Sequence, residues 1–219
     1  MTTSESTIRP DYAALMQAPV CAEPFTHIVV PHFIRKDDLP RLFASLPAIG
    51  SGGSFPPQSL KLSPLVQALV QEMEGPELRR IIAQKLDLDL ESAPSMLTIR
   101  GRTREKDGRI HTDSTAKRVT ILLYLNPAGP DWEKQEGCLR LLRSPHDIED
   151  YAKEVRPVDG TLLVFPNGPT TWHGHKQFVG SRYTIQLNYM TEDAKARSEL
   201  RRHKLSALAK KLPLPSMGY

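Results

Sequence analysis

The chain has 219 residues, of which 39% are hydrophobic and 25% are charged, a composition typical of one compact globular domain. It contains no run of about eighteen apolar residues, which a membrane-spanning helix would need. Its first residues also lack the basic and then apolar pattern of a secretory signal. Two cysteines, Cys21 and Cys138, are too few for a disulfide framework. We therefore expect a protein of the reducing cytoplasm with no membrane partner.

The formal net charge of +4 comes from the C-terminal part of the chain. Residues 192–211 contain seven Lys or Arg and three acidic residues, which leaves 22 basic and 22 acidic residues elsewhere. Because the main body is neutral, we do not expect a nucleic-acid partner. The basic segment is interpreted as a solvated helix face, with a partner-binding site as the alternative.

The first part of the chain predicts helices around one strand. Residues 1–24 are polar and interrupted by prolines, and we expect a lead-in segment with a short helix around Tyr12–Gln17. The run PFTHIVVPHFI predicts a strand, and a helix follows from about Asp37. After a loop at residues 50–58, LSPLVQALVQEMEGPELRRIIAQKL has helical spacing with a break at Gly75-Pro76.

After Asp89 the pattern changes to short β-type runs separated by Gly, Pro and Asn, namely SMLTIRG, VTILLYLN, GCLRLLR, GTLLVFP and YTIQLNYM. No helical pattern alternates with these runs, which favours an antiparallel sandwich or jelly roll over a parallel sheet. The fold class predicted is mainly β with flanking helices, the N-terminal helices packing on one face. Residues 25–191 would form this domain, and residues 192–219 a basic C-terminal helix and tail, the helix ending at Pro213.

The segment RIHTDST indicates a metal site. His111 and Asp113 are separated by one residue, so on a strand they would project to the same face. A third ligand can come from His173 or His175 in TTWHGHK. Two histidines and one carboxylate leave coordination positions open, and they are the ligand set of non-haem iron(II) oxygenases.

Arg182 adds a feature that suits one cosubstrate. It lies nine residues after His173 in the run SRYTIQLNYM, where it shares a strand face with Thr184 and Gln186. Such a polar strip in an apolar strand indicates a cavity. A guanidinium can hold a carboxylate through two parallel hydrogen bonds, as the distal carboxylate of 2-oxoglutarate requires.

The order HTD, KRVTILLYLN, EGCLRLLRSP, GTLLVFPNGPTTWH and GSRYTIQLNYM, within residues 96–190, resembles the prolyl-hydroxylase-like branch of the 2-oxoglutarate/iron(II)-dependent dioxygenases. The resemblance implies a double-stranded β-helix with the metal at its open end. It implies that the catalytic iron ligands are His111, Asp113 and His173. It also implies that Arg182 pairs with the distal carboxylate of 2-oxoglutarate and that the Tyr124 hydroxyl bonds the same carboxylate.

The sequence departs from the family pattern in two places. Close relatives carry a tyrosine on the strand before the His-x-Asp motif, whereas SMLTIRGRTREKDGR has none. Contacts to the cosubstrate there would come from Thr98 or Arg100, or be missing. The second departure is His175, which the family spacing makes a pocket residue rather than a ligand. Trp132 and Trp172 lie near these motifs and would either line a substrate cleft or pack in the core.

The activity that the resemblance implies is hydroxylation of an organic substrate with release of succinate and CO2. It would use Fe(II), 2-oxoglutarate and O2, with ascorbate as a candidate reductant. The expected substrate is a prolyl or other residue in a peptide or protein. Two alternatives remain open, a hydroxylase of a free amino acid or small metabolite and a non-catalytic jelly-roll binding module.

Overall fold

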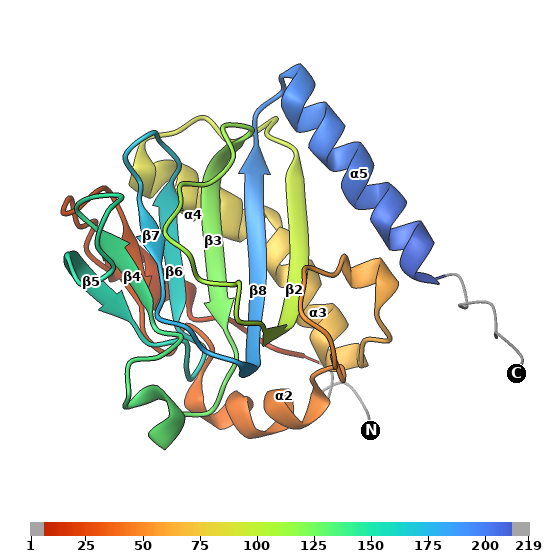
Figure 1. Cartoon of the computed structure of the whole chain (residues 1–219). Helices are drawn as coiled ribbons and strands as arrows, with labels where there is room; N and C mark the ends of the chain where they lie inside the picture. The colour runs from red at the N-terminus through yellow and green to blue at the C-terminus, as the bar shows by residue number, and fades with distance from the viewer. Residues whose placement is uncertain (1–6, 212–219) are drawn as a thin grey trace, which may run out of the picture.

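The computed structural model describes residues 7–211, with side chains to residue 205, and consists of two antiparallel sheets with helices outside the larger one (Figure 1). The large sheet has the strand order β1-β6-β3-β8-β2 and the small sheet the order β5-β4-β7. The large sheet contains β1 (Ile28–Val30), β6 (Leu162–Pro166), β3 (Lys117–Tyr124), β8 (Gly180–Met190) and β2 (Ser95–Thr103). The small sheet contains β5 (Tyr151–Val155), β4 (Leu139–Leu142) and β7 (His173–Gly174).

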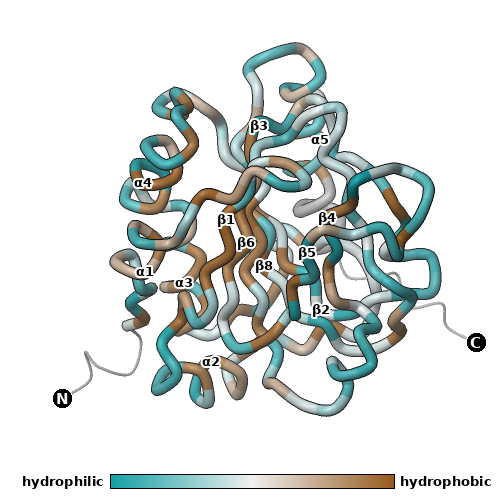
Figure 2. Tube along the Cα trace, turned by 90° about the vertical axis from the view of Figure 1, so that its left-hand side faces the viewer, coloured by the Kyte–Doolittle hydropathy of each residue, from teal (hydrophilic) through white to brown (hydrophobic). Residues whose placement is uncertain are grey.

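The helices cover one face of the large sheet. They are α1 (Tyr12–Gln17), α2 (Leu39–Ser45) after the 3-10 turn η1 (Lys36–Asp38), α3 (Pro64–Glu74) and α4 (Pro76–Leu86). Figure 1 shows α3 and α4 behind the sheet, and Figure 2 shows hydrophobic strands turned toward α1, α3 and α4. The main core lies between these two layers. The predicted jelly roll with N-terminal helices on one face is confirmed.

Local sequence explains where these helices begin. The Ser63 hydroxyl accepts a hydrogen bond from the Val66 backbone N–H at 3.3 Å, which caps the start of α3. Gly75 ends α3 and precedes α4, and a proline occupies the first turn of each helix. The predicted break at Gly75-Pro76 is therefore present.

The other face of the large sheet carries the features that build the site. On β8, Ile185 and Leu187 are buried in the main core, whereas the alternate residues Thr184 and Gln186 line a cavity on the opposite face. The strand register extends this polar face across three strands. Thr184 pairs with Tyr124 of β3 on one side and with Arg100 of β2 on the other.

The small sheet closes one side of this face. Leu139 and Leu141 of β4 and Val155 of β5 pack against residues of β3 and β6 in a second core cluster. Two further turns of 3-10 helix, η2 (Pro57–Ser59) and η3 (Pro130–Trp132), lie in the connecting segments. The remaining helix, α5 (Ala194–Lys211), extends from β8 and lies beside the β2 edge of the sheet (Figure 1).

Two predicted strands need correction, and the predicted end of the C-terminal helix lies outside the described residues. The strand predicted from PFTHIVVPHFI is only the three residues of β1. The strand predicted over RIHTDST is absent apart from a single bridge at His111, because a turn closed by the Lys117 N–H and the Ser114 carbonyl follows. The C-terminal helix is present as α5, but its predicted end at Pro213 lies outside the described residues. Among the described residues, no helix is both long and apolar enough to cross a membrane.

Candidate metal and cosubstrate site

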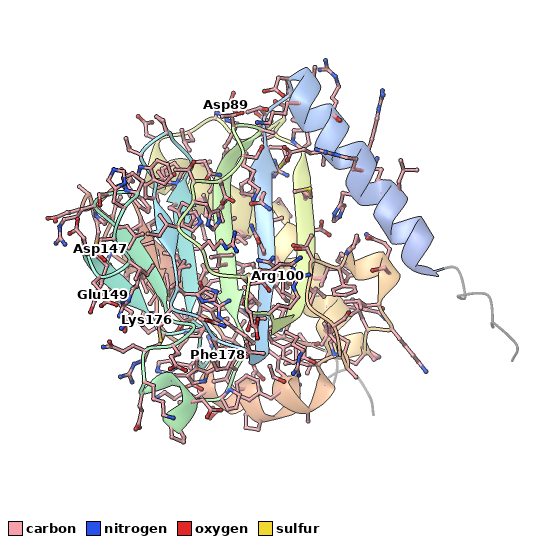
Figure 3. The ribbon with its side chains drawn as sticks, viewed as in Figure 1. Asp89, Arg100, Asp147, Glu149, Lys176 and Phe178 are labelled. Carbon is pink, nitrogen blue, oxygen red and sulfur yellow. The ribbon has the colours of Figure 1, made fainter. Side chains whose placement is uncertain are left out.

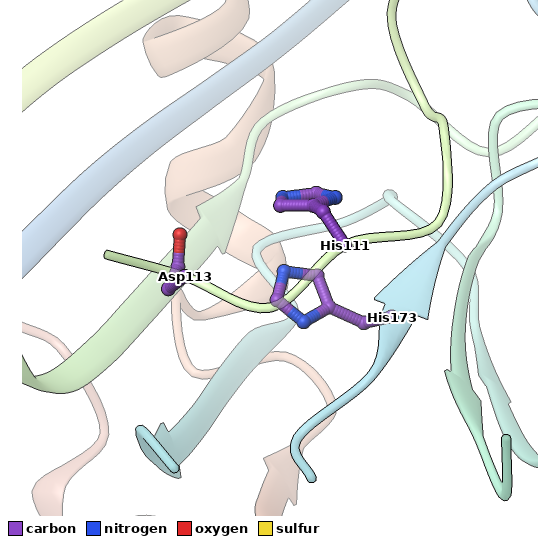
Figure 4. Close-up of side chains that lie close together, drawn as sticks. All are labelled: His111, Asp113 and His173. Atoms are coloured by element: carbon purple, nitrogen blue, oxygen red, sulfur yellow. The ribbon is translucent and has the colours of Figure 1, made fainter. Parts of the chain in front are cut away.

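Three of the predicted side chains meet on the open face of the large sheet. His111, Asp113 and His173 each place one potential ligand atom within 4.8 Å of the others (Figure 4). The two histidines come from neighbouring backbone segments that exchange hydrogen bonds of 3.0 and 2.9 Å. Three such donors at this separation can hold one divalent metal ion.

Each histidine is oriented by its own backbone. Nδ1 of His111 lies 2.8 Å from the Arg109 carbonyl oxygen, and Nδ1 of His173 lies 2.9 Å from the Thr171 carbonyl oxygen. An Nδ1–H that donates to a carbonyl leaves Nε2 with its lone pair free for a metal. Burial and the neighbouring His111 lower the pKa of His173 to about 4, so its ring is neutral at physiological pH.

Asp113 is held as a carboxylate by two donors. Lys117 Nζ donates to one oxygen at 2.7 Å, and the Thr120 hydroxyl donates to the other at 2.6 Å. Burial of Asp113 opposes its ionisation, but Lys117, His173 and these hydrogen bonds together keep its pKa below the usual value. The Asn167 amide in turn donates to the Thr120 hydroxyl at 3.0 Å, which fixes the direction of the hydroxyl proton.

No pattern in the sequence indicated that Thr120 would support the carboxylate. It lies in the run VTILLYLN, where alternation alone indicates only which face it occupies. Its role depends on a register in which β3 passes directly behind the turn at Asp113, and that register is a property of the tertiary structure.

A cavity of about 400 Å³ opens over the three side chains. Besides the triad, its lining includes Arg100, Tyr124, His175, Arg182, Thr184 and Gln186. The polar strip predicted on β8 therefore does face a cavity, and this cavity is shared with the candidate metal ligands.

Arg182 is well placed to bind an anion in this cavity. Its side chain is buried, and its Nε donates to the Gly137 carbonyl oxygen at 2.9 Å, which fixes the plane of the guanidinium. The guanidinium carbon lies 5.2 Å from the centroid of the Tyr124 ring. The buried hydroxyls of Tyr124 and Thr184 have no hydrogen-bond partner among the described residues.

Unpartnered hydroxyls in a buried site are costly unless a ligand satisfies them. Burial raises the pKa of Tyr124 in spite of the charge of Arg182 and the close approach of its guanidinium to the Tyr124 hydroxyl, so the hydroxyl keeps its proton and can donate. One guanidinium and two hydroxyl donors around one space form a suitable receptor for a carboxylate.

His175 lines the same cavity but is not part of the triad. Its Nδ1 lies 2.7 Å from the Lys176 carbonyl oxygen, and its backbone N–H donates to Gly108 at 2.9 Å. Gly108 has φ +89°, and a Cβ there would lie 2.4 Å from the His175 ring. Burial and Arg182 lower the pKa of His175 to about 4. Of the two histidines considered for the third ligand, it is His173 that meets His111 and Asp113.

The remaining candidate residues are divided between two places. Arg100 lines the cavity with the triad, whereas Thr98 lines an adjacent cavity. Trp132 is buried against Phe178, with ring centroids 4.9 Å apart, and it donates from Nε1 to the Pro127 carbonyl at 3.2 Å. Neither Trp132 nor Trp172 lines the cavity over the triad.

Comparison with known proteins supports the predicted class of the domain. Residues 101–190 match the family model of the 2OG-Fe(II) oxygenase superfamily. This segment contains all five residues that were predicted to bind metal or cosubstrate. Comparison with curated proteins gives no match. The family match confirms the predicted dioxygenase class, and with it the use of iron(II), 2-oxoglutarate and O2.

Solved structures with a similar fold include several prolyl hydroxylases. A prolyl-4-hydroxylase from Pseudomonas putida is 20% identical over 76% of this chain and 93% of its own, with a TM-score of 0.52. A prolyl 4-hydroxylase from Phytophthora capsici is 16% identical over 92% of this chain and 77% of its own, with a TM-score of 0.58. The viral collagen prolyl hydroxylase of Paramecium Bursaria Chlorella virus-1 is 11% identical, covering 80% and 94% of the two chains, with a TM-score of 0.52. The prolyl-hydroxylase-like fold is therefore established.

Proposed function

We propose that the chain is a 2OG-Fe(II) oxygenase that hydroxylates a prolyl or other residue of a peptide or protein, releasing succinate and CO2. In this proposal His111, Asp113 and His173 hold the iron, and Arg182 and Tyr124 bind the distal carboxylate of 2-oxoglutarate. A cytoplasmic location is part of the proposal and agrees with the two unpaired cysteines, Cys21 and Cys138.

The observation that carries the proposal is the sharing of one cavity by two complementary groups of residues. One group is the triad, whose ligand atoms lie within 4.8 Å of one another. The other is Arg182 with the unpartnered hydroxyls of Tyr124 and Thr184. A keto acid that chelates a metal at one end and carries a carboxylate at the other needs both groups at once.

The protein contributes positioning and charge compensation. Bound iron would supply the activation of oxygen, which no amino-acid side chain can perform. His111 and His173 are neutral donors whose rings are fixed by carbonyl oxygens. Asp113 supplies the one anionic donor of the triad, and its hydrogen bonds to Lys117 and Thr120 keep it ionised and oriented. Arg182 compensates the distal carboxylate in a buried setting where that charge would otherwise be costly.

A peptide or protein substrate is favoured by the similarity of the fold to prolyl hydroxylases. The runner-up substrate class is a free amino acid or small metabolite, which the 400 Å³ cavity could also admit. The direct test uses purified protein with iron(II), 2-oxoglutarate and O2. Succinate is measured with a panel of proline-containing peptides and with free amino acids. Stimulation by peptides and not by amino acids supports the proposal, whereas the reverse pattern favours the small-molecule alternative.

The same assay tests the chemistry separately from the substrate. Slow succinate formation without any substrate is expected in the wild type and should disappear in Asp113→Ala. If the wild type binds neither iron(II) nor 2-oxoglutarate under anaerobic conditions, the proposed site is wrong whatever the substrate.

A further inference from the structure

Arg100 is a cation of the cavity that the proposed chemistry does not use. It is half-buried on the open face of the large sheet, where Figure 3 labels it in front of β2 and β8. No hydrogen bond or ion pair joins it to another residue in the described part of the chain. Burial lowers the pKa of Arg100, Asp107 partly offsets this effect, and the repulsion of Arg182 lowers the pKa further. A buried guanidinium without a partner is costly, which indicates that a ligand supplies the missing anion.

The nearby acids Asp107 and Asp113 attract Arg100, but both are hydrogen-bonded to other residues. Both carboxylate oxygens of Asp107 accept hydrogen bonds from Arg104, through its backbone N–H, Nε and a terminal nitrogen, at 2.9 to 3.3 Å. Asp113 accepts from Lys117 and Thr120, and in the proposed function it is also a metal ligand.

The charges of the loaded site also leave room for a second anion. Iron(II) would bring two positive charges, and 2-oxoglutarate two negative ones. Lys117 balances Asp113, to which it is hydrogen-bonded. The cavity lining contains five basic residues and two acidic ones, so positive charge remains in excess; the basic residues are Arg100, Lys106, Arg109, Lys117 and Arg182, and the acidic ones are Asp107 and Asp113. An acidic group on the substrate would compensate it.

The position of Arg100 separates it from the proposed cosubstrate receptor. Tyr124, Thr184 and Arg100 occupy one row across β3, β8 and β2, with Thr184 in the middle. Neighbouring strands are about 4.8 Å apart, so the backbones of Tyr124 and Arg100 are about 10 Å apart along the row. The Arg182 guanidinium lies against the Tyr124 ring, on the side of the middle strand β8 away from β2.

On the β2 side, a second cavity lies between the first one and α5. An adjacent cavity of about 570 Å³ shares Ser54, Lys117 and Gln186 with the first one. Its lining includes Met96 and Thr98, which follow the same face of β2 as Arg100.

The far wall of this adjacent cavity is the basic helix. Arg202 and Glu199 of α5 both line it. Glu199 accepts a hydrogen bond from Ser114 at 2.6 Å, whereas Arg202 is exposed. We call the joined cavities the β2–α5 groove, defined by Arg100, Thr98, Met96, Lys117, Gln186 and Arg202.

We propose that the substrate is an acidic peptide segment that lies in the β2–α5 groove, with one carboxylate side chain bound by Arg100 and a further acidic residue near Arg202. This proposal rests on the proposed function and adds the chemistry of the substrate to it. The groove runs along a strand face, which suits an extended chain, and its excess charge is positive. A carboxylate paired with Arg100 satisfies the guanidinium that is otherwise unpartnered.

The test measures binding of two peptides to the full chain loaded with Mn(II) and saturated with 2-oxoglutarate. One peptide has proline flanked by glutamates, and the other has glutamines in their place. The wild type should bind the acidic peptide at least about tenfold more tightly at low salt, as one charge-assisted contact predicts. Arg100→Gln should abolish this preference, and Arg202→Gln should reduce it several-fold. The matched control is Arg201→Gln, an exposed arginine of α5 that does not line the groove.

Four other outcomes are possible, and each contradicts a different part of the proposal. Equal binding of both peptides to the wild type overturns the acidic substrate. Equal losses in Arg201→Gln and Arg202→Gln overturn the placement along α5. A weakening of 2-oxoglutarate rather than of the peptide in Arg100→Gln would make Arg100 a cosubstrate residue. If the wild type does not bind 2-oxoglutarate at all, the proposed function fails, and the peptide preference can still be measured without it.

Discussion

The backbone of His111 exchanges two hydrogen bonds with the backbone of His173, and their imidazole rings lie 4.4 Å apart between centroids. This bridge joins segments that are far apart in the sequence, before any metal binds. The backbone holds the two histidines together, so the fold does not depend on their side chains. Substitutions at the proposed metal site should therefore remove the metal and preserve the fold.

Asp113→Ala should abolish iron binding and 2-oxoglutarate turnover while leaving the fold intact, with a lower melting temperature because the mostly buried Lys117 loses its partner. Asp113 is the one anionic member of the triad, and its removal leaves two neutral imidazoles for a dication. Iron content and circular-dichroism melting of the purified variant measure both effects. Asp107→Ala is the matched control, because Asp107 lines the same cavity but pairs with Arg104. Normal iron content in Asp113→Ala would rule out the proposed ligand set.

Thr120→Val should weaken metal binding without abolishing it. The Thr120 hydroxyl donates to Asp113 at 2.6 Å, and residues that orient a ligand in this way typically change metal affinity by roughly 10- to 100-fold. Competition with a chelator gives the affinity. Thr98→Val is the control, since Thr98 is also a buried threonine on the large sheet but makes no contact with the carboxylate. Equal affinities in the wild type and Thr120→Val would show that Lys117 alone orients Asp113.

The two histidines of TTWHGHK should respond differently to alanine. His173→Ala should lose iron, because its ring lies beside His111 and Asp113. His175→Ala should keep iron, since its side chain lines the cavity without joining the triad. Metal content of both purified variants decides between them. If His175→Ala loses iron and His173→Ala keeps it, the third ligand is His175 and not His173.

Short-range patterns in the sequence predicted much of this architecture. Helical spacing and the Gly75-Pro76 break predicted α3 and α4, and alternation with turn residues predicted the strands of a jelly roll. The polar strip from Arg182 to Gln186 was predicted because strand residues two apart share a face. These features depend on local periodicity, which a sequence displays directly.

Features that depend on register and chain reversal were not predictable in the same way. The strand expected over RIHTDST is a single bridge followed by a turn, although His111 and Asp113 still reach the same space. Thr120 supports Asp113 only because β3 returns behind that turn. The sequence also could not predict that the Arg100 guanidinium has no hydrogen-bonded partner. Only the folded chain shows that the nearby Asp107 is hydrogen-bonded to Arg104.

Arg140 should be important for stability, because it is a charged residue inside the small sheet. Its side chain is fully buried, and its Nε donates to Glu154 at 2.8 Å. Arg140→Met would leave the mostly buried Glu154 carboxylate without its partner, at a cost of about 3–5 kcal/mol. Urea unfolding followed by circular dichroism gives the difference. Arg143→Met is the control, and the exposed ion pairs it loses should cost less than about 1 kcal/mol. Similar losses in both variants would contradict the structural role of Arg140.

Arg182→Met and Tyr124→Phe should separate cosubstrate binding from metal binding. Neither residue belongs to the triad, so both variants should bind iron as the wild type does. Loss of Arg182 removes a buried charge-assisted contact and leaves the carboxylate without a partner, which should weaken 2-oxoglutarate by roughly 2–5 kcal/mol. Loss of the Tyr124 hydroxyl removes one hydrogen bond to a charged group and should cost about 0.5–3 kcal/mol.

The most specific expectation is that Arg182→Met weakens 2-oxoglutarate binding more than Tyr124→Phe does. Arg182 contributes both charge and hydrogen bonds, whereas Tyr124 contributes a hydrogen bond alone. Calorimetric titration of 2-oxoglutarate into anaerobic, iron-loaded protein measures both. Thr184→Val is a third variant, since its buried hydroxyl also lacks a partner among the described residues and lies next to Tyr124 in the strand register. It should weaken 2-oxoglutarate by an amount similar to Tyr124→Phe. If Arg182→Met binds 2-oxoglutarate as tightly as the wild type, the cosubstrate does not occupy this end of the cavity, and the two hydroxyls must serve another ligand.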